Sequence, residues 1–395
     1  MLKHKLELAV FIATTLYIMN TGILLIGLQV YFMGAVSDAR IALLSTVYWI
    51  PIIFLSPFWG YIADATGRRK EIVVLNLILL GLVTYLHKIL CSYDDILLLR
   101  IIAGFFSASY SPIVQAGITY NVSPRMFGER IAIFNVGVAT GFLLSCYTVS
   151  ITLIFFPVME LFTIASLTTL ASAVIVLFSP IQSAKTGTNL TARQALATSL
   201  SIPLVKHLLA GRGILLVIAL TIRHMAIMGL FSLIYVYMQK MGVSSQSLGI
   251  ISSFNNLTQI ILIPVSGMLV DRIGRKRIFV PGFFLSSLIP MFFMRAGTSL
   301  EFALSFIFTG IAYSLLISGA NTYVRDIAPK GRESEVLSLM NTTRALGMII
   351  GPMMVGFLVE KYNYETMFFS LFLTGIFSTI IASLCTETYK VQKFY

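Results

Sequence analysis

The stretch GYIADATGRRK, residues 60–70, returns as GMLVDRIGRKR at residues 267–277. Both copies follow the pattern G-x-x-x-D-x-x-G-R-[RK]-[KR], at a spacing of 207 residues. Each copy ends one long apolar run and begins another, which indicates a short charged turn between two membrane-spanning helices. The repetition predicts that the chain is a duplication of one helical unit.

The composition agrees with a membrane protein. Of the 395 residues, 57% are hydrophobic and only 11% are charged, and the mean hydropathy is +0.90. So little charge excludes a soluble domain of this size. We therefore predict an all-α membrane protein with twelve transmembrane helices in two six-helix bundles. The predicted spans are residues 7–35, 41–63, 71–90, 96–121, 130–156, 159–179, 213–239, 246–270, 278–294, 299–324, 336–359 and 365–385.

The basic residues predict how the chain lies in the membrane. With a cytoplasmic N-terminus, 20 of the 28 Lys and Arg residues fall on cytoplasmic segments, 5 lie outside and 3 lie within helices. This bias is the positive-inside rule, so the net charge of +12 reports orientation and contact with anionic lipid rather than nucleic-acid binding. We expect a multi-pass protein of the cell membrane, monomeric, with both termini in the cytoplasm. The predicted domains are residues 1–183 and 212–395, joined by a cytoplasmic linker at 184–211.

The three cysteines lie far apart at positions 91, 146 and 385. This spacing fits neither a disulfide framework nor a thiolate metal site, and we expect no metal and no cofactor.

The duplication extends beyond the turn, because three further pairs are separated by 206 residues: Gly104 and Gly310, Gln115 and Asn321, and Asn135 and Asn341. Parallel repeats predict two bundles related by an axis along the membrane normal, with a solute site between them near mid-depth.

With these motifs the chain resembles the major facilitator superfamily over essentially its whole length. The duplicated turn after helices 2 and 8 is that family's signature, and Arg100 with Gly104 match its R-x-x-x-G motif on helix 4. The phrase SPFWGYIADATGRRK, from Ser56, is closest to the drug and antibiotic exporter branch. That branch usually has a glycine and proline motif on helix 5, whereas GVATGFLLSC, residues 137–146, has no proline. This departure weakens an antiporter assignment.

The resemblance implies that the duplicated turn is a conformational latch, which would hold the two halves together on the cytoplasmic side in the outward-open state. Glycines permit a tight turn, and an aspartate can face the positive N-terminus of a neighbouring helix. Asp326, at the end of helix 10, is available as an acidic partner for Arg275, whereas helix 4 has no equivalent acid. The latch residues are Gly60, Asp64, Gly67, Arg68, Arg69, Gly267, Asp271, Gly274, Arg275 and Asp326.

Three arginines fall inside predicted spans, where each costs about 2.5–3.5 kcal/mol on insertion scales. Arg100 lies near the outer end of helix 4 and could reach the interface or pair with Asp94 or Asp95. Arg223 and Arg344 lie near the middle of helices 7 and 11, and no acid falls within the spans to neutralise them. Water or an anionic solute could neutralise both.

Polar residues also recur at helical spacing, and together they could line one cavity. Each is as well suited to a hydrogen bond between helices as to solute contact. His224 is the one histidine that we place well inside a span, where it could carry protons or make a helix contact. The candidate solute-binding residues are Asn20, Tyr48, Gln115, Arg223, His224, Asn256, Gln259, Asn321, Asn341 and Arg344.

The leading hypothesis is a secondary transporter that moves a small organic solute by alternating access, with proton-linked export of drugs as the form that the exporter resemblance implies. The rival is an organic-anion uniporter or exchanger that uses Arg223 and Arg344. A sensor that resembles a transporter is a remote third. We expect no enzyme, because the chain has no G-x-x-x-x-G-K-[ST] loop, H-E-x-x-H helix or G-x-S-x-G elbow. The substrate and the coupling ion, a proton or a counter-anion, stay open.

Overall fold

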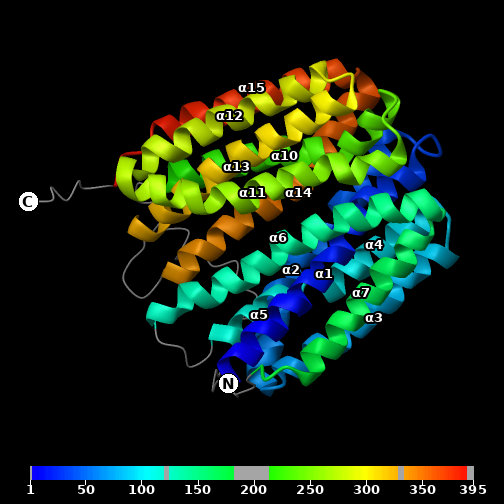
Figure 1. Cartoon of the computed structure of the whole chain (residues 1–395), viewed down its shortest axis with the longest axis vertical. Helices are drawn as coiled ribbons and strands as arrows, with labels where there is room; N and C mark the ends of the chain where they lie inside the picture. The colour runs from blue at the N-terminus through cyan, green and yellow to red at the C-terminus, as the bar shows by residue number, and fades with distance from the viewer. Residues whose placement is uncertain (1, 120–123, 182–212, 328–332, 389–395) are drawn as a thin grey trace, which may run out of the picture. The chain divides into compact units, whose positions relative to one another are not determined.

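A computed structural model describes residues 2–119, 124–181, 213–327 and 333–388, and every regular element in these ranges is an α-helix (Figure 1). The described residues contain 12 helical segments that are long and apolar enough to cross a membrane. This confirms the predicted fold class and the number of spans. The expected linker at residues 184–211 lies outside the described residues.

The chain divides into two compact units. Unit 1 comprises residues 1–36, 44–200 and 244–250, and unit 2 comprises residues 37–43, 201–243 and 251–395. The helices of the first half are α1 (Leu2–Phe32), α2 (Asp38–Thr66), α3 (Arg69–Ile89), α4 (Tyr93–Ser107), α5 (Tyr110–Thr119), α6 (Pro124–Phe155) and α7 (Glu160–Phe178). Those of the second half are α10 (Ile214–Lys240), α11 (Ser245–Ile273), α12 (Arg275–Arg295), α13 (Ser299–Ile327), α14 (Glu333–Lys361) and α15 (Tyr364–Ser383).

The fourth predicted span is the one that the structure breaks. It consists of α4 and α5, separated by a turn at residues 108 and 109. The break has a local cause, because Pro112 has no backbone N–H to donate to the carbonyl of Ala108, and its ring crowds that carbonyl. The second half has no proline at the matching position, Ser318, and α13 runs unbroken.

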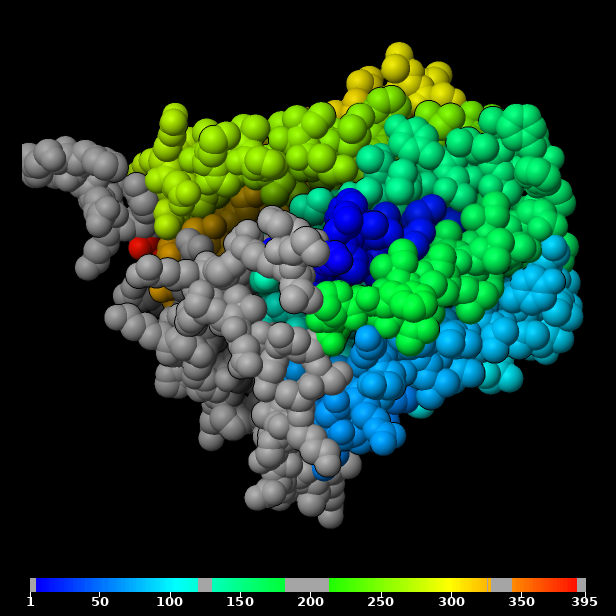
Figure 2. All heavy atoms as spheres, turned by 60° about the horizontal axis from the view of Figure 1, so that its bottom comes forward, coloured from blue at the N-terminus to red at the C-terminus, as the bar shows by residue number. Residues whose placement is uncertain are grey.

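The same packing scheme occurs in both units. In unit 1, α1 packs against α6 and α7, and α3 packs against α7 and α4. In unit 2, α10 packs against α14 and α15, and α12 packs against α15 and α13. Figure 2 shows part of this scheme, with α7 (green) beside both α1 (dark blue) and α3 (light blue). The duplication inferred from the turn is therefore also a duplication of tertiary structure.

Matched glycines make equivalent helix crossings in the two units. A Cβ added to Gly104 of α4 would lie 2.3 Å from the backbone oxygen of Tyr48 in α2. A Cβ added to Gly310 of α13 would lie 2.8 Å from the backbone oxygen of Asn255 in α11. Asn255 follows Tyr48 by 207 residues, so the same contact occurs at the same place in each repeat. Glycine is required here because the two backbones approach too closely for a side chain.

The crossing of α4 and α2 at Gly104 should not tolerate a side chain. Gly104→Ala should lower the unfolding free energy by about 1–3 kcal/mol, the usual cost of overpacking, because the added methyl would lie 2.3 Å from the backbone oxygen of Tyr48. Gly60→Ala is a matched control in α2, where an added Cβ meets nothing within 4 Å. Thermal unfolding of the purified variants in detergent should place Gly104→Ala well below Gly60→Ala. Equal melting temperatures would show that the crossing is not tight.

Candidate functional site

The first copy of the repeated turn is a compact ion-paired corner between α2 and α3. Gly67 has φ +68°, a left-handed conformation that lets the chain reverse in two residues. Arg69, the first residue of α3, donates through Nε and Nη2 to Oδ1 of Asp64 at 3.1 and 2.6 Å. Arg69 is buried, whereas Arg68 is exposed.

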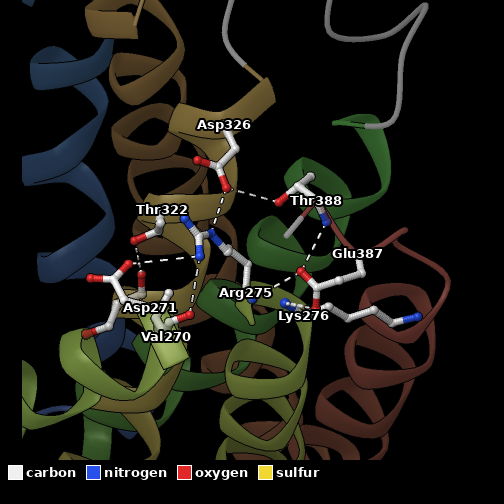
Figure 3. Close-up of polar contacts among 9 residues, drawn as sticks. Val270, Asp271, Arg275, Lys276, Thr322, Asp326, Glu387 and Thr388 are labelled. Atoms are coloured by element: carbon white, nitrogen blue, oxygen red, sulfur yellow. Dashed lines mark hydrogen bonds and ion pairs between the residues drawn. The ribbon is translucent and has the colours of Figure 1, made fainter. Parts of the chain in front are cut away.

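The second copy of the turn is built differently (Figure 3). Gly274 has φ +113°, and Arg275 begins α12 directly after it. The Nε of Arg275 donates to Oδ2 of Asp326, at the end of α13, over 2.7 Å. The carboxylate of Asp271 is 3.9 Å from Nη1 of Arg275 and has a side chain that is 72% exposed. The predicted partner Asp326 therefore makes the closer pair, and it joins the turn to α13.

A residue beyond the last helix completes this second turn. The carboxylate of Glu387 accepts the backbone N–H groups of Arg275 and Lys276, each at 3.1 Å. Thr388 donates its hydroxyl to Oδ2 of Asp326 at 3.2 Å (Figure 3). These N–H groups begin α12 and have no partner within the helix, so a carboxylate is well placed to cap them. No sequence motif marks Glu387, and the sequence analysis missed it.

The two copies thus share a scheme but differ in their partners. In unit 1 the start of α3 is tied to the end of α7, because Lys70 donates to the backbone oxygen of Ser179 at 3.2 Å. In unit 2, Glu387 plays the corresponding part, because it connects the start of α12 to the segment after α15. The first glycine of each copy of the motif does not form a turn. Gly60 and Gly267 lie inside α2 and α11, with open space where a Cβ would point. We call the unit 2 set of Asp271, Gly274, Arg275, Asp326, Glu387 and Thr388 the α12 corner.

Arg100 does not use the acids that the sequence suggested. Its side chain is buried, its Nε donates to the backbone oxygen of Leu44 at 3.3 Å, and its guanidinium lies 4.0 Å from the centre of the Tyr48 ring. No described ion pair joins it to Asp94 or Asp95. The carboxylate of Asp95 instead accepts a hydrogen bond from the hydroxyl of Ser92 at 2.6 Å, at the start of α4. Arg100 therefore joins α4 to α2 within unit 1.

Arg223 lies in the interior of unit 2 and is only 1% exposed. Its Nε and Nη2 are each 3.4 Å from the hydroxyl oxygen of Ser286 in α12. Its Cζ is 5.5 Å from the centre of the Tyr313 ring in α13. The third nitrogen, Nη1, is buried without a hydrogen-bond partner among the described residues. The ion pairs of the described residues do not include Arg223.

His224 of α10 contacts α14, the helix that carries Arg344. Nδ1 of His224 is 3.4 Å from the hydroxyl oxygen of Thr343 in α14. A Cβ added to Gly347, one turn further along α14, would lie 2.4 Å from the Cβ of His224. His224 is therefore a packed contact between α10 and α14.

Two of the predicted solute-binding residues are bonded inside unit 1. Asn20 donates its side-chain amide to the Thr84 hydroxyl at 3.0 Å and to the backbone oxygen of Ala165 at 3.1 Å. Tyr48 donates its hydroxyl to that of Ser107 at 2.9 Å. Both side chains are buried. Their geometry fits hydrogen bonds between helices.

The other predicted residues are spread over several helices. Gln259 donates to the side-chain oxygen of Asn255 on its own helix at 2.9 Å. Gln115 and Asn256 are half-buried, and Asn321 is exposed. The side chain of Asn341 lies outside the described residues. Their convergence on one solute is a prediction that stays open.

A second buried histidine was missed by the sequence analysis. His87 of α3 is fully buried, and its Nδ1 lies 2.9 Å from the backbone oxygen of Val83. Its Nε2 has no hydrogen-bond partner among the described residues. It lies near the end of the predicted span at residues 71–90.

The comparison with known families decides the assignment. The family model described as the Major Facilitator Superfamily matches residues 10–253 and 217–393. The chain belongs to the Major Facilitator Superfamily. It is accordingly a multi-pass membrane transporter of this superfamily, as the resemblance of the duplicated turn implied.

Similar superfamily members include efflux pumps. The chain is 23% identical over 343 residues to the multi-drug resistance efflux pump PmrA of Streptococcus pneumoniae, which covers 84% of this chain and 82% of that protein. It is 31% identical over 159 residues to an uncharacterised transporter of the same type from Methanocaldococcus jannaschii, a match that spans 40% of this chain and 41% of the relative. A crystal structure of a variant of the nucleoside transporter NupG has the same fold, with a TM-score of 0.81 at 16% identity, covering 98% of this chain and all of that one.

Proposed function

We propose that this chain is a secondary transporter that exports small organic solutes by alternating access of its two units. The observation that carries the proposal is the likeness to the efflux pump PmrA, which extends over most of both proteins. The ion-paired turns support it, because a latch needs charged groups whose pairing differs between two states of the protein.

The test is a proteoliposome assay with three fluorescent solutes of different charge: carboxyfluorescein, Nile red and ethidium. The reconstituted protein should move at least one of them faster than protein-free liposomes do. A pH gradient and a counter-anion gradient are applied separately, so that the coupling ion is read from the gradient that drives movement. If no solute moves under either gradient, the proposed function is wrong.

The orientation with a cytoplasmic N-terminus is part of the proposal, and Cys91 tests it. Cys91 is exposed between α3 and α4, where this orientation puts it outside the cell. A membrane-impermeant maleimide should therefore label intact cells, and Cys91→Ser should abolish that label. Labelling only after permeabilisation would reverse the orientation.

Cys385 gives the matched internal control. It is buried, and this burial raises the pKa of its thiol to about 11 from an ordinary value of 9.0. Alkylation requires the thiolate, so Cys385 should stay unlabelled near neutral pH even in permeabilised membranes. Its labelling should rise only as the pH approaches that pKa.

A further inference from the structure

Arg223 carries a full positive charge in the interior of unit 2, and the described ion pairs give it no negatively charged partner. Its contacts are a serine hydroxyl, which it meets at the limit of hydrogen-bond distance, and the face of a tyrosine ring. Both partners are neutral. A buried guanidinium needs a carboxylate or a comparable anion to offset the loss of water, and the described ion pairs of unit 2 do not include Arg223.

One donor of Arg223 is also left unused. Nη1 is buried and has no hydrogen-bond partner among the described residues, although Nε and Nη2 share Ser286. An arginine presents its nitrogens as a planar fork that suits a two-oxygen anion. The structure thus holds a buried donor and a charge that an oxyanion would satisfy together.

A second cation makes the same region more positive. Arg344 of α14 follows Thr343, whose hydroxyl oxygen lies 3.4 Å from Nδ1 of His224, the residue after Arg223. Two like charges in a medium of low dielectric constant repel each other, which adds to the cost of burying Arg223. An anion bound near both would relieve that repulsion.

The duplicated fold shows that packing does not demand these charges. Gly22 of α1 and Gly229 of α10, 207 residues apart, make the matching contacts in the two units, Gly22 with Ser145 and Gly229 with Gly351, which are themselves 206 residues apart. In this register Arg223 corresponds to Leu16 and Arg344 to Val138. Unit 1 therefore builds the same helix pair with apolar residues at both positions.

We propose that Arg223 and Arg344, with the hydroxyl of Ser286, bind an anionic group of the transported organic solute, such as a carboxylate or a sulfonate. This inference rests on the proposed function, because it names the chemical class of the solute. Other side chains would contact the neutral part of the solute.

The first experiment needs no ligand. In the purified protein, Arg223→Met should raise the apparent melting temperature by several degrees, because an uncompensated buried charge is replaced by an apolar chain of similar length. The matched control is Arg295→Met, at the exposed end of α12, which should leave the melting temperature unchanged. If Arg223→Met melts below the control, Arg223 is a structural contact and the proposal is overturned.

The second experiment measures ligand stabilisation with probes of matched shape: benzoate, naphthalene-2-sulfonate, benzamide, benzylammonium and inorganic phosphate. The two aromatic anions should raise the melting temperature of the wild type and of Arg295→Met, and the effect should vanish in Arg223→Met. Benzamide and benzylammonium should have no effect. Stabilisation by phosphate alone would mean that the site takes an inorganic anion, and stabilisation by none of the anions would overturn the proposal.

These measurements separate the two proposals, because binding in detergent does not require transport. Anion stabilisation without movement of any solute in proteoliposomes would overturn the exporter and leave the anion site. Transport of ethidium or Nile red with no stabilisation by either aromatic anion would overturn the anion site and leave the exporter.

Discussion

Asp326→Asn is expected to lower the rate of transport about tenfold and to lower the melting temperature of the purified protein. The Arg275 side chain is 12% exposed, and its Nε donates to Asp326 over 2.7 Å. Losing a hydrogen bond to a charged partner costs about 1.5–3 kcal/mol, and about 1.4 kcal/mol is a factor of ten. If the α12 corner stabilises one state of the transport cycle, that factor appears directly in the rate of transport.

Asp271→Asn is the matched control, because it removes a carboxylate from the same arginine at the longer distance of 3.9 Å. The Asp271 carboxylate is mostly exposed, so its pairing energy should be small. The exchange Asp326→Arg with Arg275→Asp should recover part of the lost transport. Equal effects of the two asparagine variants would show that the closer pair has no special role.

Much of the fold could be predicted because both halves of the chain carry the same sequence signals. Apolar length marks the spans, and the turn motif with its spacing of 207 residues marks the duplication. The ion-pair partner of Arg275 could also be predicted, because Asp326 is an acid at the end of the neighbouring span. The break between α4 and α5 had a local signal, Pro112, but proline is tolerated in many spans and does not by itself locate a break.

The details of the site were harder to predict because they depend on which side chain fills a given space. Asp64 pairs with Arg69 rather than with Arg68, although both follow the same glycine. Asn20 and Tyr48 have the polarity of solute-binding residues, yet their bonds run between helices. Glu387 caps a helix that begins 112 residues earlier, and no local pattern reports such a contact.

The α12 corner is also asymmetric with respect to its counterpart in unit 1. Asp64 and Arg69 form a pair across the turn between α2 and α3, and Lys70 ties the start of α3 to the end of one further helix, α7. Arg275 instead joins the turn to α13 through Asp326, and Glu387 joins it to the segment after α15. A displacement of α12 must therefore break contacts with two other elements. We infer that the second copy of the latch is the more costly one to open.

Gly274→Ala should be the most damaging single substitution in this corner. Its φ of +113° and ψ of 159° lie in a region that is essentially limited to glycine, so the change costs about 1–3 kcal/mol in backbone strain. The new Cβ would also lie 2.9 Å from Oε2 of Glu387 and would push the cap away from the start of α12. Gly242→Ala isolates the first effect, because Gly242 has φ +86° with nothing within 4 Å of an added Cβ.

The melting temperatures of Gly274→Ala, Gly242→Ala and Glu387→Gln, together with the double variant Gly274→Ala/Glu387→Gln, separate the strain from the loss of the cap. Gly274→Ala should melt below Gly242→Ala, and the two changes at 274 and 387 should cost less together than the sum of the single changes, because each removes the same contact. Strict additivity would mean that Glu387 does not cap α12 in solution. The cap would then contribute nothing to the cost of opening this corner, and Asp326 alone would have to hold it.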